Sequence, residues 1–236
     1  MLRLSERLVH KMGRWFIEKI TRLEYESQNP RRINERAVEY GFVFSCLAEL
    51  APSTVLDVGT GRTALPSLLK TCGYRVTAVD NIKDYWPKSA FNRHFYVLND
   101  DITNSKLNEK YDVVVCISVL EHVVEYESAL ETMVSLTKPG GHLIISCPYS
   151  ESTASANCYE EEGSYGSKNP YICRQFTRLD FQKWLDSTGA EILKQQYWQF
   201  FESKYWSCGK QIQPPKIAQP EEQHQLACML IRVPAQ

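Results

Sequence analysis

The chain has 236 residues, of which 43% are hydrophobic and 23% are charged, and its formal net charge at pH 7 is −1. This length supports one large domain with a full hydrophobic core, and the composition is that of an ordinary soluble globular protein. The nearly balanced charge gives no general attraction to nucleic acid or acidic membranes. We therefore expect no nucleic-acid partner, although a local basic patch stays open.

The cysteines and the N-terminal residues bear on the compartment. Eight cysteines are scattered without any C-x-x-C pair, which predicts reduced, mostly structural thiols and no zinc site. Reduced thiols indicate a cytoplasmic protein. No apolar run reaches the roughly 18 residues that a membrane-spanning helix needs, and arginines and lysines interrupt the N-terminus. Neither a transmembrane segment nor a signal peptide is expected.

The first 50 residues are predicted to be helical. Residues 2–25 indicate one amphipathic helix, because apolar residues recur three or four apart from Leu4 and Leu8 onward. We expect this helix to pack on its own domain or on a second copy, which would make a homodimer. A basic helix lying on a membrane surface is the alternative. A break at 29–32 precedes a second helix at about 33–50.

From residue 51 onward strands and helices alternate, which predicts a doubly wound, Rossmann-like α/β fold with a mostly parallel sheet. Seven strands are expected, at 54–58, 75–80, 94–98, 111–117, 142–147, 191–200 and 225–233. No helix joins the last two strands, so we expect an antiparallel pair at one edge of the sheet. Two long segments with little periodicity, 149–176 and 201–224, are predicted to be insertions.

A glycine-containing turn follows the first strand of this region. The apolar run of 55–58 includes Asp57, and Gly59 and Gly61 come before a helical pattern, which is typical of a strand, a tight turn and a helix N-terminus. With Ala64, the glycines also fit the fingerprint of dinucleotide folds, so an NAD-type Rossmann oxidoreductase is one alternative. Asp57 argues against it, because a carboxylate would repel a pyrophosphate. An adenosyl ligand that carries an ammonium and a sulfonium matches better.

Acidic residues also follow the next strands. Asp80 ends the second strand, 19 residues after Gly61, where a carboxylate can accept two hydrogen bonds from a ribose diol. A helix-capping role is the alternative for Asp80. Asn81 and Ile82 would then lie against the adenine. All these residues stand at the carboxyl ends of predicted strands, where open α/β sheets bind ligands.

These residues resemble motif I of class I S-adenosylmethionine-dependent methyltransferases, written D-x-G-x-G-x-G, with Thr63 in place of the last glycine. The resemblance implies that Asp57, Gly59 and Gly61 bind S-adenosyl-L-methionine. It implies that residues 1–50 form an N-terminal helical cap on a methyltransferase domain of residues 51–236.

The resemblance also implies roles for two residues after the third strand. Methyltransferases of this class commonly place an acidic residue there to accept the adenine amino group, with an apolar neighbour on the ring. Asp101 and Ile102 are assigned these roles, and Asp100 is the second choice for the acidic one. A polar turn without a ligand is the alternative.

A second segment, 117–123, resembles motif IV of small-molecule methyltransferases, in which such a segment ends in Glu-His. The resemblance implies that the backbone at Ser118 faces the methionine part of the cofactor. His122 could act as a general base, or it could simply pack at a helix start. Some relatives bind a divalent metal through E-x-x-E-H, but Ser118 replaces the first Glu and is a poor ligand for a hard dication, so no metal site is predicted.

The sequence thus predicts an S-adenosylmethionine-dependent methyltransferase that acts on an O, N or C atom of a small-molecule acceptor. The two insertions are expected to build the acceptor pocket, with Tyr149 nearest the methyl group because it directly follows the fifth strand. Two alternatives stay open, an NAD-type oxidoreductase and a non-catalytic regulatory or scaffold subunit that binds the cofactor.

Overall fold

The computed structural model describes residues 4–26, 34–88 and 90–235, and the chain divides into two units, residues 1–33 and residues 34–236. In the first unit, α1 (Leu4–Glu26) is one continuous helix on which Leu8, Met12 and Trp15 are exposed. The predicted break at 29–32 lies outside the described residues. The homodimer contact through this helix stays a prediction. Across the described part of the chain, no helix combines the length and apolar character required to cross a membrane.

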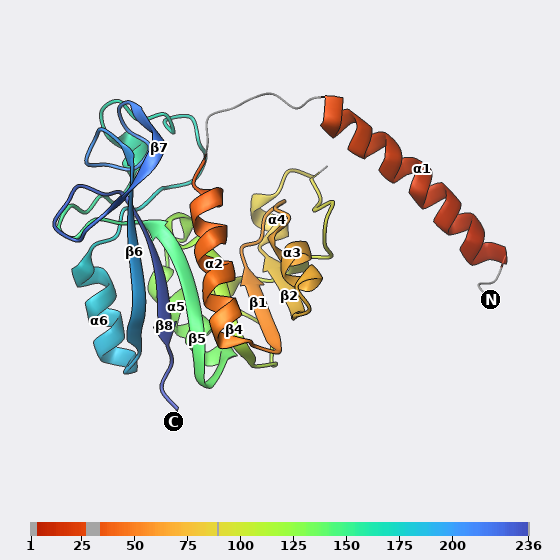
Figure 1. The fold of residues 1–236 in the computed structure, drawn as a ribbon, viewed down its shortest axis with the longest axis horizontal. Coiled ribbons are helices and arrows are strands. Elements are labelled where there is room, and N and C mark those ends of the chain that lie inside the picture. The colour runs from red at the N-terminus through yellow and green to blue at the C-terminus, as the bar shows by residue number, and fades with distance from the viewer. Residues whose placement is uncertain (1–3, 27–33, 89, 236) are drawn as a thin grey trace. The chain divides into compact units, whose positions relative to one another are not determined.

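The second unit is a doubly wound α/β fold built on an eight-stranded sheet (Figure 1). The strands are β1 (Thr54–Val58), β2 (Arg75–Asp80), β3 (Leu98–Asn99), β4 (Tyr111–Ile117), β5 (Thr137–Pro148), β6 (Glu191–Phe201), β7 (Gln211–Ala218) and β8 (Leu226–Arg232). Their order is β3-β2-β1-β4-β5-β8-β6-β7. The pairs from β3 to β5 are parallel, and the pairs that involve β6, β7 and β8 are antiparallel.

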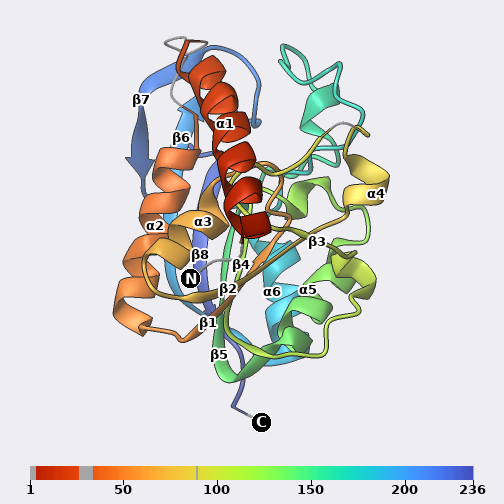
Figure 2. The same ribbon diagram turned by 90° about the vertical axis from the view of Figure 1, so that its right-hand side faces the viewer.

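Helices cover both faces of the sheet (Figure 2). α2 (Arg36–Leu50) and α3 (Leu65–Thr71) pack on one face, against side chains such as Val55 and Val115. α5 (Tyr126–Leu136) and α6 (Arg178–Thr188) pack on the other face, against side chains such as Leu56 and Val114. Because successive side chains of a strand point to opposite faces, a central strand buried on both sides must be apolar throughout, as β1 and β4 largely are.

The predicted fold class is confirmed, but the strand positions differ from the expectation in four places. β5 begins at Thr137 rather than at 142, because Thr137 already pairs with Tyr111 of β4 before a register shift. Only Leu98 of the segment 94–98 belongs to a strand, the two-residue β3. The Asn92 side chain accepts hydrogen bonds from the N–H groups of His94 and Phe95 that a longer strand would need. The second insertion contains β7, which is the eighth strand.

The expected antiparallel pair is present as β6 and β8, but the additional strand β7 lies outside it. β8 lies between β5 and β6, and its residues Leu226 to Ile231 are all buried. An interior place suits this strand because both of its faces are apolar. β7 forms the edge instead, and its Pro214 and Pro215 cannot donate hydrogen bonds to another strand.

Asp112 lies at the start of β4 and hydrogen-bonds to the residues before and at the start of β1. Its carboxylate accepts hydrogen bonds from the N–H groups of Ser53 and Thr54, the Thr54 hydroxyl and Lys138 Nζ, at 2.7 to 3.0 Å. Burial opposes ionisation of Asp112, but the hydrogen bonds from Lys138 and Thr54 outweigh it and lower its pKa to about 2.

We expect Asp112→Asn to lower the free energy of unfolding at pH 7 by about 1–2 kcal/mol, because an amide accepts these bonds less strongly than a carboxylate. A folded-state pKa below the unfolded value gives stability that is present above about pH 4 and is lost as the pH falls toward 2. Urea unfolding at several pH values checks this, with Asp186→Asn on the exposed side of α6 as the control. A difference from the wild type that persists undiminished at pH 2.5 would contradict the assignment.

Candidate active site

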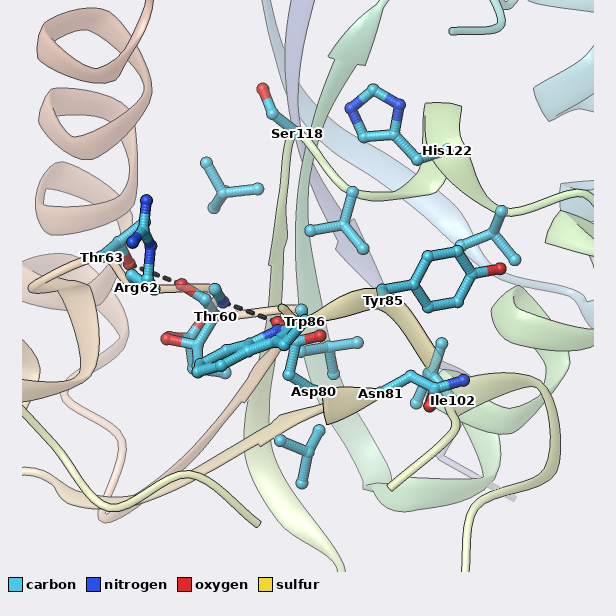
Figure 3. A pocket seen from close by; sticks show the side chains of 18 of the residues that line it. Thr60, Arg62, Thr63, Asp80, Asn81, Tyr85, Trp86, Ile102, Ser118 and His122 are labelled. Atoms are coloured by element: carbon cyan, nitrogen blue, oxygen red, sulfur yellow. Dashed lines mark hydrogen bonds between the residues drawn. The ribbon is translucent and has the colours of Figure 1, made fainter. Parts of the chain in front are cut away.

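A cavity of about 500 Å³ opens where β1, β2 and β4 end (Figure 3). Its lining comes from the start of α2, the β1–α3 loop, the end of β2 and part of the segment from there to residue 90, the turn after β3, the segment after β4, and Tyr171 of the first insertion. Nine of the predicted site residues line it, namely Asp57, Gly59, Gly61, Asp80, Asn81, Asp101, Ile102, Ser118 and His122. Ile82 and Tyr149 do not line it. Most of the residues predicted from their place at the carboxyl ends of strands therefore lie together in one cavity.

The β1–α3 loop needs glycine at two positions. Gly59 has φ +67° and Gly61 has φ +56°, in the left-handed region that favours glycine. A Cβ on Gly59 would lie 2.5 Å from both Cγ atoms of Val119, whereas a Cβ on Gly61 would meet nothing within 4 Å. Gly59 is thus required for packing between the loop and the end of β4, and Gly61 leaves open space beside the cavity.

We expect Gly59→Ala to lower the free energy of unfolding by about 1–3 kcal/mol, because the new Cβ overlaps Val119 and the backbone is strained. Val119→Ala in the same chain should recover part of the loss by making room. Gly41→Ala is the control, since Gly41 lies inside α2 with nothing within 4 Å of its Cβ position. Urea unfolding measures all four chains, and a Gly59→Ala chain as stable as the wild type would refute the packing argument.

Asp57 is buried under this loop with an incomplete set of hydrogen bonds. Its side chain is 2% exposed and Oδ2 has no hydrogen-bond partner. Burial raises the pKa of Asp57 to about 7, and the nearby Asp80 carboxylate adds to the increase. A cationic group bound beside Asp57 would favour its ionised form and supply the missing partner.

Asp80 supports the loop from the end of β2. Its Oδ2 accepts a hydrogen bond from the Gly61 N–H at 2.7 Å, and the Trp86 side chain also hydrogen-bonds to the carboxylate. Asn81 lines the cavity at the start of α4 (Ile82–Tyr85), but Ile82 does not. The apolar lining on this side comes from Tyr85 and Trp86, which sequence analysis missed because no periodicity marks a single helical turn.

The two aspartates after β3 have different partners. Asp100 is buried, and its carboxylate accepts from the Ser105 hydroxyl and from the Lys106 N–H. Asp101 is exposed and uses one oxygen, Oδ1, for the N–H and hydroxyl of Thr103. Both line the cavity. Asp100 therefore organises its own turn, and Asp101 is the better placed of the two to contact a ligand.

The first turn of α2 contributes Arg36, a cavity residue that no sequence motif identified. Arg36 Nη1 lies 2.8 Å from Glu39 Oε2 and 3.2 Å from the carbonyl oxygen of Ile117. Glu39 is fully buried, and its Oε1 accepts from the hydroxyls of Ser118 and Ser146. Burial raises the pKa of Glu39, while the Arg36 charge and the serine hydroxyls oppose this. The network places one guanidinium at the wall of the cavity.

His122 lies near Ser118 at one end of the cavity, with Asp80, Asn81 and Ile102 at the other end (Figure 3). His122 Nδ1 lies 2.6 Å from the carbonyl oxygen of Ile172, which can only accept, so Nδ1 carries a proton. Burial lowers the pKa of His122, which favours a neutral ring with an unprotonated Nε2 near pH 7.

His122 has three further neighbours, Tyr159, Tyr171 and Glu121. The Tyr159 ring is stacked with the imidazole at 6.4 Å between ring centres. The Tyr171 ring lies 4.6 Å from the imidazole, edge to face, and it also lines the cavity. Glu121 Oε1 lies 3.8 Å from His122 Nε2, and Glu121 Oε2 is buried without a hydrogen-bond partner. Burial raises the pKa of Glu121 well above its usual value.

The structure does not bring Tyr149 to this cavity. Tyr149 is 1% exposed and packs in the core against Phe181, Tyr197 and His224, with ring-centre distances of 5.8 to 6.1 Å. Its position next to β5 suggested the ligand-binding edge. The chain instead continues the alternation of the strand, which directs this side chain toward α6.

The two insertions pack on each other. Gln175 Nε2 donates to the carbonyl oxygens of Thr153 and Lys204, and its Oε1 accepts from the Trp206 N–H. The insertion 149–176 contributes Tyr171 to the cavity, whereas no residue of 201–224 lines it. The second insertion thus packs against the first and does not line the cavity itself, contrary to the expectation that both would. Among the described residues, no group of three or more His, Cys, Asp or Glu is arranged to hold a metal ion.

Comparison with known proteins gives a family match and several partial relatives. A family model described as a methyltransferase domain matches residues 17–195. The chain is 31% identical over 125 residues to a ubiquinone biosynthesis O-methyltransferase of Rickettsia prowazekii (strain Madrid E), which covers 49% of this chain and 48% of that protein. A protein of the same name from Alkalilimnicola ehrlichii (strain ATCC BAA-1101 / DSM 17681 / MLHE-1) is 32% identical over 125 residues, covering 50% and 48%. The chain spans about half the length of the curated relatives it matches.

A solved structure covers more of the chain. The 1,6-didemethyltoxoflavin-N1-methyltransferase of Burkholderia thailandensis, with bound 1,6-didemethyltoxoflavin and S-adenosylhomocysteine, superposes with a TM-score of 0.56. The two chains share 16% identity over 99% of this chain and 92% of that one. At this identity the similarity shows a shared fold.

Proposed function

Because the chain belongs to the methyltransferase family, we propose that it transfers a methyl group from S-adenosylmethionine to a hydroxyl group of a small molecule. The observation that carries the proposal is one cavity that joins the motif I loop, the acidic residues after β2 and β3, and His122. This arrangement combines a binding site for an adenosyl cofactor with a neutral histidine.

The residues present fit the cofactor. The unpartnered Asp57 Oδ2 suits a ligand with cationic groups. The open space beside Gly61 allows close approach to the backbone. We assign the ribose to Asp80 and the adenine to Asp101 and Ile102, which lie at one end of the cavity.

The amino-acid part of the cofactor is then assigned to the other end, beside Ser118 and Arg36. A guanidinium can form two parallel hydrogen bonds to a carboxylate, which makes Arg36 the preferred partner for the methionine carboxylate. Arg36 donates its hydrogen bonds to Glu39 and Ile117 from one nitrogen, Nη1. The proposal assigns the remaining N–H groups of the guanidinium to the methionine carboxylate.

His122 is assigned the role of general base. S-Adenosylmethionine supplies an electrophilic methyl group, and the acceptor hydroxyl must lose its proton as it takes up the methyl. The Ile172 carbonyl holds the imidazole so that Nε2 is the unprotonated nitrogen, which is the atom that would accept this proton. The O-methyltransferase names of the curated relatives support a hydroxyl acceptor.

Tyr171 supports an acceptor of small size. Its ring lines the cavity beside His122, and aromatic side chains with a few polar groups are typical of small-molecule pockets.

A cytoplasmic location is also part of the proposal.

Calorimetry with S-adenosylmethionine, S-adenosylhomocysteine and NAD tests the cofactor. We expect binding of both sulfur compounds and none of NAD, and the reverse result would favour an oxidoreductase. Incubation of the chain with labelled S-adenosylmethionine and small-molecule extract then tests transfer. Cofactor binding without transfer to any compound would favour a regulatory subunit.

A further inference from the structure

Glu39 of α2 connects the cofactor cavity to two strands through a fully buried carboxylate. We propose that Glu39 is a positioning residue for the amino-acid part of the cofactor, because it holds Ser118 and Arg36 at that end of the cavity. The inference rests on the proposed function and extends it to a residue outside every motif of this chain.

The hydrogen bonds of Glu39 reach three different elements. Its Oε1 accepts from the Ser118 hydroxyl at 2.5 Å and from the Ser146 hydroxyl at 2.6 Å. Its Oε2 accepts from Arg36 Nη1 at 2.8 Å, and the same nitrogen donates to the Ile117 carbonyl at 3.2 Å. One carboxylate therefore connects the start of α2 to the ends of β4 and β5.

Packing alone does not explain this carboxylate. Glu39 is 0% exposed and lies on the side of α2 that carries Phe42 and Val43 into the core. A buried charge is costly, and an apolar residue of similar size would fill such a position at least as well. The cost points to a function that depends on the oxygens of Glu39.

Ser118 has the backbone conformation that requires support. Its φ is +50°, a left-handed value that strains any residue with a Cβ. The Ser118 N–H donates to the carbonyl and hydroxyl oxygens of Ser146, and its own hydroxyl donates to Glu39. Because Ser118 lines the cavity, the backbone conformation that Glu39 stabilises there also sets the shape of this end of the cavity.

A double-mutant cycle between Glu39 and Ser118 tests the proposal. Calorimetry measures the Kd of S-adenosylhomocysteine for the wild type, Glu39→Ala, Ser118→Gly and the double variant. We expect Glu39→Ala to raise the Kd at least tenfold. Glycine adopts the left-handed conformation without support. The fold-increase in Kd caused by Glu39→Ala should therefore be at least three times smaller in the Ser118→Gly background than in the wild type.

Two controls separate positioning from general stability. Leu47→Ala removes a buried side chain from the same helix, two turns further along, and should lower the melting temperature while leaving the Kd within about twofold. Binding of 5′-methylthioadenosine, which lacks the amino-acid part, should be nearly equal in the wild type and Glu39→Ala. An equal effect of Glu39→Ala in both Ser118 backgrounds, or an equal loss of 5′-methylthioadenosine binding, would overturn the proposal.

A crystal structure of ligand-free Glu39→Ala gives a readout that does not depend on the cofactor. We expect Ser118 to leave the left-handed conformation there, and a Ser118 that keeps it would overturn the proposal. If the wild type bound neither sulfur compound, the proposed function would fail, and this structure would still decide whether Glu39 holds Ser118.

Discussion

Replacing His122 with Asn is expected to lower kcat by about 10²–10⁴-fold, the usual contribution of a positioned general base. Asn keeps a polar side chain near the Ile172 carbonyl but has no basic nitrogen. The Kd of S-adenosylhomocysteine should change less than threefold, because the assigned cofactor contacts come from other residues. Steady-state kinetics and calorimetry give the two values.

The dependence of the wild-type rate on pH should reflect the ionisation of His122. Burial lowers the pKa of His122 from 6.5, and the neutral form is the active one. The rate should therefore rise as the pH increases through a value below 6.5 and be level near pH 7. This limb should be missing in His122→Asn.

His142→Asn is the matched control, since His142 lies near the amino-terminal end of the parallel part of β5, beside the start of β4 and away from the cavity. Its kcat should equal that of the wild type. A His122→Asn enzyme with full turnover would exclude His122 as the base and would favour an acceptor that needs no deprotonation.

Removing the Asp80 carboxylate should have the largest effect on cofactor binding. We expect Asp80→Ala to raise the Kd of S-adenosylhomocysteine at least tenfold where one ribose hydrogen bond is lost, and by about 10²–10⁴-fold where both are lost. Each hydrogen bond from a ribose hydroxyl to a charged group contributes about 1.5–3 kcal/mol, and a factor of ten corresponds to about 1.4 kcal/mol. The Gly61 N–H also loses its acceptor, so the loop that faces the cofactor is less well held.

Asp84→Ala provides the control for Asp80→Ala. Asp84 lies on α4, four residues further along, is exposed, and does not line the cavity. Its removal should leave the Kd within twofold. Circular dichroism must show both variants to be folded. An Asp80→Ala chain that is folded and binds with the wild-type Kd would remove Asp80 from the site.

The order of residues along the chain was enough to predict most of the parallel strands, although β3 is shorter and β5 longer than expected, and to predict one end of the cavity. Strands such as 54–58 and 111–117 are apolar on both faces, and only a central strand buries both. Asp57 lies in β1 just before the turn glycines, Asp80 is the last residue of β2, and Asp101 comes after β3. Since parallel strands end at one edge, local order along the chain was enough to bring Asp57, Asp80 and Asp101 to one cavity.

Contacts between distant parts of the chain set which residues surround the end of the cavity at Ser118 and His122. Glu39 contacts Ser118 across 79 residues and Ser146 across 107, and His122 contacts Ile172 across 50. The spacing of apolar residues cannot predict such contacts, because it indicates only whether a segment is a helix or a strand and which of its faces is buried. Which parts of the chain meet depends on how α2 and the first insertion fold back over the sheet.

The same reason explains the residues whose positions differ from the prediction. Tyr149 follows β5 directly, yet its side chain lies in the core, because the alternation along the strand rather than the strand end sets its direction. β7, which was expected to be part of an insertion, is the edge strand, while β8 lies between β5 and β6, because pairing on both sides buries both of its apolar faces. In both cases the free energy of burying side chains against distant elements determines the position, and that energy depends on the whole fold.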